Sequence, residues 1–210
     1  MALALTELPM PIAPEILHDL TDVLRLRNGQ SLTVRFVEPE DIGPLSDYFH
    51  ALSRRSNYNR FLGAMHDLPA REIATILATG EANRFAVIGE VLVDGVTRVV
   101  AEARYAWHPQ HDIAEFGMSV ADGWQGVGIG SALLKNLECR TAALGASRLV
   151  GDTLRSNGEM QGLARKLGYA FTHSPEGWNL VRVQKQIHAA ADIPCVNWRE
   201  IAPSLDMAAG

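Results

Sequence analysis

The sequence predicts an α+β fold, in which helices flank a mixed, mostly antiparallel twisted sheet. The predicted elements follow the order β-β-α-α-β-β-β-α-β-α-β-β. Three consecutive central strands joined by short turns indicate an antiparallel meander. Only one strand–helix unit and a pair of returning strands follow, whereas a doubly wound parallel sheet needs repeated strand–helix units.

The N-terminal half supplies the first strand pair and the first helices. Residues 23–27 and 32–37 are predicted strands on either side of Asn28-Gly29, a pair that suits a turn with positive φ. The segment 38–41 opens a helix, because proline and acidic residues favour a helix N-terminus. A polar stretch over 53–59 separates it from a second helix that is expected to begin at Pro69.

The C-terminal half supplies the meander and the strand–helix unit. The turn at Asp94-Gly95 joins the first two strands of the meander, and Gly145 and Gly168 are helix-stop signals. The expected strands are 85–93, 97–107, 112–120, 148–152, 169–171 and 178–187, and the expected helices are 129–144 and 157–167.

Length and composition favour one core-forming domain over 22–188. It would follow an N-terminal arm with a short helix (1–21) and precede a weakly patterned tail (189–210). The net charge of −5 argues against nucleic acid or an anionic membrane as the main partner. The apolar N-terminus lacks a basic region and is interrupted by prolines, so neither a signal peptide nor a membrane span is expected. With only two cysteines, of which Cys139 is expected to be a buried thiol, we expect a cytoplasmic protein.

The most informative segment lies between a predicted strand and a predicted helix. After the strand ends at Val120, Gln125-Gly126-Val127-Gly128-Ile129-Gly130 leads into the helix. Glycines allow tight turns and remove side chains that would obstruct a ligand. The first N–H groups of a helix have no intrahelical partner, so such a turn can bind a pyrophosphate.

Other kinds of glycine-rich turn fit this segment less well. A simple turn before a helix remains possible for any isolated GxG pair. A Walker loop is excluded, because no Gly-Lys-Ser/Thr follows. In a Rossmann turn the glycines follow the strand directly with GxGxxG spacing, which is not found here. The pattern that remains is Gln-x-x-Gly-x-Gly after a strand.

This pattern resembles the coenzyme A motif of the Gcn5-related N-acetyltransferase (GNAT) superfamily, and the resemblance runs from about Val23 to Ile187. It is strongest to the GNAT domain of bacterial Pat-type protein lysine acetyltransferases. The shared segments are Arg35 to Asp41, Leu52 to Gly63, Glu115-Phe116, the loop itself, Asn157-Gly-Glu-Met160 and Leu167-Gly168-Tyr169. The resemblance implies the GNAT fold, in which splayed central strands hold coenzyme A.

The resemblance also implies which residues bind acetyl-CoA, the expected co-substrate. Gln125 and Gly126 would start the loop, and the backbone amides near the helix start would hold the pyrophosphate. The strand end would pair with the pantetheine arm, and Asn157 would contact the cofactor. The expected cofactor-binding residues are Met118, Ser119, Val120, Gln125, Gly126, Val127, Gly128, Ile129, Gly130, Ser131 and Asn157.

Acetyl transfer to an amine requires a base, because the amine is an ammonium ion near neutral pH. Glu115 lies in the last strand before the loop, where strand alternation places it on one face with Gly117 and Ser119. The alternative is a solvent-facing glutamate on a half-buried strand, and the resemblance favours the base. Glu102 on the preceding strand is the competing carboxylate.

The sequence departs from the family at the expected general acid. Many members carry a tyrosine seven residues after the asparagine, where this chain has Ala164. Tyr169 begins a strand and is not expected to substitute for it. Pat-like members resemble this chain in lacking the tyrosine, so water is the expected proton source for the leaving thiolate.

Several other side chains have two interpretations. His108 and His111 have no third ligand nearby in sequence, so they are interpreted as a solvated loop and no metal site is expected. Tyr58, Arg60 and Phe61 either line the acceptor entrance, or Phe61 belongs to the core and Arg60 to a structural ion pair.

The function expected from the resemblance is acetyl transfer from acetyl-CoA to a primary amine. A protein lysine is the first candidate acceptor, and a small-molecule amine is the second. A coenzyme-A-binding regulatory module without catalysis is the alternative from another class. A homodimer is possible.

Overall fold

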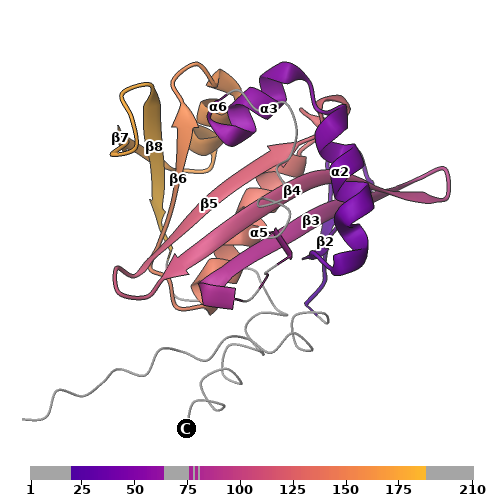
Figure 1. Cartoon of the computed structure of the whole chain (residues 1–210), viewed down its shortest axis with the longest axis horizontal. Coiled ribbons are helices and arrows are strands. Elements are labelled where there is room, and N and C mark those ends of the chain that lie inside the picture. The colour runs from indigo at the N-terminus through magenta and orange to yellow at the C-terminus, as the bar shows by residue number, and fades with distance from the viewer. Residues whose placement is uncertain (1–19, 64–75, 78, 80, 188–210) are drawn as a thin grey trace, which may run out of the picture.

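An eight-stranded sheet organises the computed structural model, which describes residues 20–63, 76, 77, 79 and 81–187 (Figure 1). The spatial order of the strands is β1-β2-β3-β4-β5-β6-β8-β7. Their bounds are β1 Asp22–Arg25, β2 Ser31–Phe36, β3 Arg84–Val93, β4 Val96–His108, β5 Ile113–Val120, β6 Arg148–Leu154, β7 Ala170–His173 and β8 Leu180–Gln186.

The sheet is antiparallel except where β5 and β6 pair in parallel. This single parallel pair is the place where α5 (Ile129–Ala143) crosses over from one strand to the next. The predicted turns are found at Gly29 (φ +85°) and Gly95 (φ +78°), where the backbone adopts the left-handed conformation. The mixed, mostly antiparallel α+β fold predicted from the sequence is therefore confirmed.

Two apolar clusters cover the two faces of the sheet. Strand β3 contributes to both, because Phe85 and Val87 pack with α5 while Ile88 packs with α2 (Ile42–Ala51) on the opposite face. Helix α6 (Gly158–Lys166) joins the α5 side through Ala164, and α3 (Arg54–Phe61) joins the α2 side through Phe61. The strand that leads into the glycine-rich loop thus belongs to a sheet that is covered by helices on both faces.

The main difference from the sequence analysis is helix α3. It forms within the polar stretch that separated the two expected helices, with Ser53 as its N-cap. No residue of α3 is buried, so no apolar periodicity marked it in the sequence. The helix expected from Pro69, the N-terminal arm and the C-terminal tail lie mostly outside the described residues.

The state of Cys139 on α5 differs from the expectation. It is disulfide-bonded, so the expectation of a buried thiol is wrong. Within the described part of the chain, no helix combines the length and the apolar character needed to cross a membrane.

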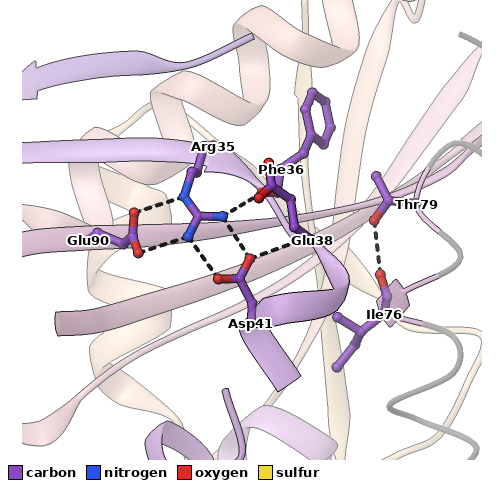
Figure 2. Close-up of polar contacts among 7 residues, drawn as sticks. All are labelled: Arg35, Phe36, Glu38, Asp41, Ile76, Thr79 and Glu90. Carbon is purple, nitrogen blue, oxygen red and sulfur yellow. Dashed lines mark hydrogen bonds and ion pairs between the residues drawn. The ribbon is translucent and has the colours of Figure 1, made fainter. Parts of the chain in front are cut away.

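A partly buried ionic cluster fixes the start of α2 against the sheet (Figure 2). Arg35 on β2 donates two hydrogen bonds to Asp41 (2.7 and 2.8 Å) and two to Glu90 on β3 (2.9 and 3.0 Å). Burial favours the neutral form of Asp41, but the hydrogen bonds from Arg35 and from the Glu38 amide outweigh it and lower its pKa. The Arg35–Asp41 segment that resembles the Pat-type enzymes therefore has a structural role.

Candidate active site

The candidate site is a cavity of about 560 Å³ that opens where β5 and β6 separate. The two strands pair only from Ile113 to Glu115 on β5, opposite Arg148 to Val150 on β6. Beyond these pairs both strands line the cavity, over 116–120 of β5 and 151–153 of β6. In Figure 1 the strands diverge below α3 and α6, whose residues complete the cavity wall.

Gly151 allows the close contact at the point of separation. The ring of Phe116 occupies the space of a side chain at Gly151, since an added Cβ would lie 2.7 Å from Phe116 Cε1. On the other side, β5 stays paired with β4 as far as Val120. The edge of β5 that faces the gap is therefore available, within the described sheet, for an extended ligand to pair with its backbone.

The glycine-rich loop forms the cavity wall at the N-terminus of α5. Gly126 has φ +79°, and Gly128, the N-cap residue of α5, has φ +107°, both in the region that favours glycine. The first helical amides follow directly and have no intrahelical acceptor. Gln125 closes the loop, because its Nε2 donates to the Val120 carbonyl at 3.0 Å.

Most of the predicted cofactor residues line this cavity together. They are Met118, Ser119, Val120, Gln125, Gly126, Gly128, Gly130, Ser131 and Asn157. Among the described residues, Val127 and Ile129 are not on the lining, and the Ile129 side chain is buried in the core. Asn157 has a second role, since its Oδ1 accepts from the Met160 amide and caps α6.

Arg27 is a functional candidate that the sequence analysis missed. It lies beside the β1–β2 turn, lines the cavity, and approaches the loop so closely that a Cβ on Gly128 would lie 3.6 Å from its Cγ. A cation beside a helix N-terminus complements an anionic ligand. The only sequence signal was a basic residue before a tight turn, which does not indicate where that turn packs.

The opposite side of the cavity is built from side chains of α3 and β5. Gly117 and Ser119 share one face of β5, as predicted from alternation, and this face is turned towards α3: a Cβ on Gly117 would lie 3.1 Å from an Arg60 nitrogen. The Ser119 hydroxyl lies 2.9 Å from the Tyr48 hydroxyl on α2. Burial raises the pKa of Tyr48 despite this hydrogen bond, so the phenol stays protonated.

Glu102 is the buried anchor of this side. Its side chain is fully buried, and Arg60 donates to both of its oxygens (2.8 and 2.9 Å) while Arg104 approaches at 2.9 Å. Complete burial alone would raise the pKa of Glu102, but the two guanidinium groups outweigh it and lower the pKa. A carboxylate held in this way is a weak base, so the structure favours an anchoring role for Glu102.

Glu115, the predicted base, lies just before the strands separate. Its side chain is 51% exposed and lies 3.6 Å from His108 and 3.8 Å from Arg182. Among the described residues, the cavity lining includes Asp152 rather than Glu115. Arg182 connects the two carboxylates, since it also binds Asp152 at 2.6 Å.

Neither Ala164, which stands where the family has its tyrosine, nor Tyr169 is on the described cavity lining. Ala164 on α6 is fully buried against the core, while Leu163 and Lys166 on the same helix line the cavity. The Tyr169 hydroxyl donates to Glu138 at 3.0 Å, away from the site. The fold therefore leaves no room for a phenol at position 164 without repacking α6.

The three remaining candidates, Tyr58, Arg60 and Phe61, have different surroundings in the structure. Phe61 packs against the α2 cluster, and Arg60 makes the ion pair with Glu102 while also lining the cavity, so both interpretations apply to Arg60. Tyr58 is 45% exposed and is not among the described residues that line the cavity, although the adjacent Asn59 is.

Comparison with known proteins identifies this architecture. The family model described as Acetyltransferase (GNAT) family matches residues 46–169, which include α3, the glycine-rich loop and Asn157. Acetyltransferase PA5475 of Pseudomonas aeruginosa is 23% identical over 151 residues, covering 72% of this chain and 81% of that protein.

Solved structures share the fold. The GNAT domain of S. lividans PAT superposes with a TM-score of 0.72 at 24% identity, covering 79% of this chain and 96% of that one. A cAMP-binding acyltransferase from Mycobacterium smegmatis gives a TM-score of 0.57 at 20% identity, and the match covers 95% of this chain and 63% of the Mycobacterium chain. Together with the cavity between diverging strands, the family match shows that this chain belongs to the GNAT family of acetyltransferases.

Proposed function

We propose that this protein transfers an acetyl group from acetyl-CoA to a primary amine, with a protein lysine as the first candidate acceptor. The observation that carries the proposal is the cavity between β5 and β6, which is bounded at one end by the glycine-rich start of α5. Membership of the GNAT family supplies the reaction type.

The residues present fit the phosphates and the pantetheine arm of acetyl-CoA. Gly128 has φ +107°, a conformation that residues with side chains rarely adopt, and an added Cβ there would contact Arg27 at 3.6 Å. The amides at the start of α5, with Arg27, would hold the pyrophosphate. The free edge of β5 from Met118 to Val120 would bind the pantetheine amides. When bound, acetyl-CoA supplies the thioester that the amine attacks.

Proton removal from the amine falls to a carboxylate on the acceptor face. We keep Glu115 as the proposed base, acting through water because its carboxylate is exposed and lies outside the cavity lining. Asp152 is the alternative base, since it lines the cavity and shares Arg182 with Glu115. Water is the proposed proton source for the thiolate.

A protein lysine is favoured over a small amine by the segment Leu52–Gly63, which resembles the Pat-type enzymes and forms α3 on the acceptor side. The structural likeness to the GNAT domain of S. lividans PAT agrees with this choice. A non-catalytic coenzyme-A-binding module remains the alternative from another class.

Two measurements on the purified protein test the proposal. Calorimetric titration with acetyl-CoA is expected to show one site per chain. Incubation with acetyl-CoA and either single-lysine peptides or a panel of small amines is then followed by mass spectrometry and by thiol release. Acetylated peptide supports a protein lysine, and acetylated small amine supports the second acceptor. Binding without thiol release above the protein-free rate would indicate a non-catalytic module.

A further inference from the structure

Helix α3 forms part of the acceptor side of the cavity, here called the acceptor wall, but few apolar contacts hold it in place. It has eight residues, none of them buried, and a helix this short is unstable in isolation. Its contribution to the cavity comes from Ser56, Asn59 and Arg60. The polar contacts at its two ends must therefore determine where these side chains lie.

The N-terminal end of α3 is bound by the carboxylate of Asp122, in the segment between β5 and the glycine-rich loop. Asp122, two residues after β5 and three before Gln125, accepts hydrogen bonds from the Ser53 amide (2.9 Å), the Ser53 hydroxyl (2.8 Å) and the Ser56 hydroxyl (2.8 Å). Ser53 is the N-cap of α3, and its hydroxyl also accepts from the Ser56 amide at 3.2 Å. The start of α3 thus depends on the position of the loop.

A second residue of the loop contacts the same serine. Gln125 Nε2 lies 3.5 Å from the Ser56 hydroxyl while it closes the loop on the Val120 carbonyl. The loop that is shaped for phosphate and the start of α3 therefore share one hydrogen-bonded network, although they are about seventy positions apart in the sequence.

Other attachments of α3 lead to β4 and α2, and an exposed pair joins Arg55 to Glu159 on α6 at 3.3 Å. Arg60 at its far end binds Glu102 on β4 and lies over Gly117. Asn57 donates to the carbonyls that end α2, at 3.2 and 3.4 Å. These contacts fix α3 to the rest of the molecule, whereas the hydrogen bonds between α3 and the region of the loop, within the described residues, involve Asp122 and Gln125.

We propose that Asp122 is a positioning residue that couples cofactor binding to the acceptor wall: a ligand that orders the phosphate loop also orders α3, and so favours binding of the amine. This rests on the proposed function, because it assumes that the loop binds coenzyme A. Coupling of this kind requires an element whose arrangement both sites influence, and the Asp122–Ser53–Ser56 network supplies it.

Hydrogen exchange with coenzyme A as the probe tests the coupling without knowledge of the acceptor. In the parent protein, coenzyme A is expected to slow exchange both in the loop (125–131) and in α3 (54–61), by about tenfold or more. In Asp122→Asn, which keeps the size of the side chain but removes its charge and one acceptor, loop protection should persist and α3 protection should be lost. Ser56→Ala removes one of the three bonds and should give an intermediate loss.

Asp112→Asn is the matched control. Asp112 accepts from the Ser147 amide at 3.1 Å at the opposite end of β5, so this variant should behave like the parent. A kinetic measurement complements the exchange data: with the best single-lysine peptide, Asp122→Asn should raise the peptide KM about tenfold while kcat changes by less than about twofold.

Each outcome decides a different point. If coenzyme A protects neither segment in the parent, the proposed function fails together with the inference. If the loop is protected but α3 is not, cofactor binding stands and the coupling is refuted. If Asp122→Asn keeps the parental protection of α3, Asp122 is not the residue that transmits the effect.

Discussion

The two sides of the cavity are built in different ways. The cofactor side is mainly backbone: glycines with positive φ at 126 and 128 followed by the first turn of α5. The acceptor side is made of side chains from separate elements, joined by buried ion pairs such as Arg60–Glu102. A backbone site is specified by a short local motif, whereas a side-chain site depends on how distant segments pack.

This contrast predicts that ionisation of a side chain controls turnover but not cofactor affinity. Glu115→Gln keeps the size of the side chain and removes the base, so kcat should fall by roughly 10²–10⁴ while acetyl-CoA affinity stays near the parental value. A pH–rate profile should lose or shift its ascending limb. Calorimetry with acetyl-CoA provides the affinity.

Asp152→Asn is the matched variant for Glu115. If it loses the ascending limb while Glu115→Gln keeps near-parental turnover, Asp152 is the base and Glu115 only supports Arg182. Loss of acetyl-CoA binding in Glu115→Gln would instead mean that Glu115 holds the diverging strands in place.

The buried anchor of the acceptor side should matter most for stability. Glu102→Gln leaves Arg60 and Arg104 without their shared carboxylate, so the free energy of unfolding should fall by about 3–5 kcal/mol in urea denaturation. Glu159→Gln removes a carboxylate from an exposed pair with Arg55 and should change it by less than about 1 kcal/mol. Equal effects would contradict the anchoring role.

The same anchor predicts a pH dependence. Because the pKa of Glu102 is lower in the folded protein than in the unfolded chain, its stabilising contribution is complete above the unfolded value of about 4.3. That contribution is lost as the pH falls through the folded pKa. Acid unfolding curves of the parent and of Glu102→Gln should therefore converge at low pH.

The backbone side should be sensitive to added side chains. Gly128→Val places a branched side chain at φ +107° beside Arg27, so the Kd for acetyl-CoA should rise at least about 100-fold, or about 2.8 kcal/mol. Gly95→Val, at φ +78° in the β3–β4 turn, imposes a similar backbone strain away from the cavity. It should reduce stability without changing affinity, and unchanged affinity in Gly128→Val would remove the loop from the site.

The smallest expected effect concerns Arg27, a cation of the β1–β2 turn that lies beside the glycine-rich loop. Arg27→Gln should weaken acetyl-CoA binding by about 5- to 15-fold, as for a lost charged hydrogen bond to phosphate. Because Arg27 is positively charged, this loss of acetyl-CoA affinity should become smaller as the salt concentration is raised. Arg25→Gln, on the preceding strand, is the control. An Arg27→Gln variant with parental affinity at low salt would contradict the assignment.

The sequence by itself determined where most strands lie along the chain, the turns at Gly29 and Gly95, and the glycine-rich start of α5. These depend on local properties: the period of apolar residues, the φ values open to glycine, and the unpaired amides of a helix start. Most of the predicted cofactor residues therefore line one cavity.

The arrangement of side chains on the acceptor side is determined only by the tertiary structure. Helix α3 forms in a polar stretch where the hydroxyls of Ser53 and Ser56 donate hydrogen bonds to Asp122. No local sequence pattern predicts this contact. Glu102 and Glu115 look equivalent in sequence, yet one is buried between two arginines and the other is half exposed. Burial and ionic pairing depend on which distant segments pack together, so no local pattern could assign the roles of these carboxylates.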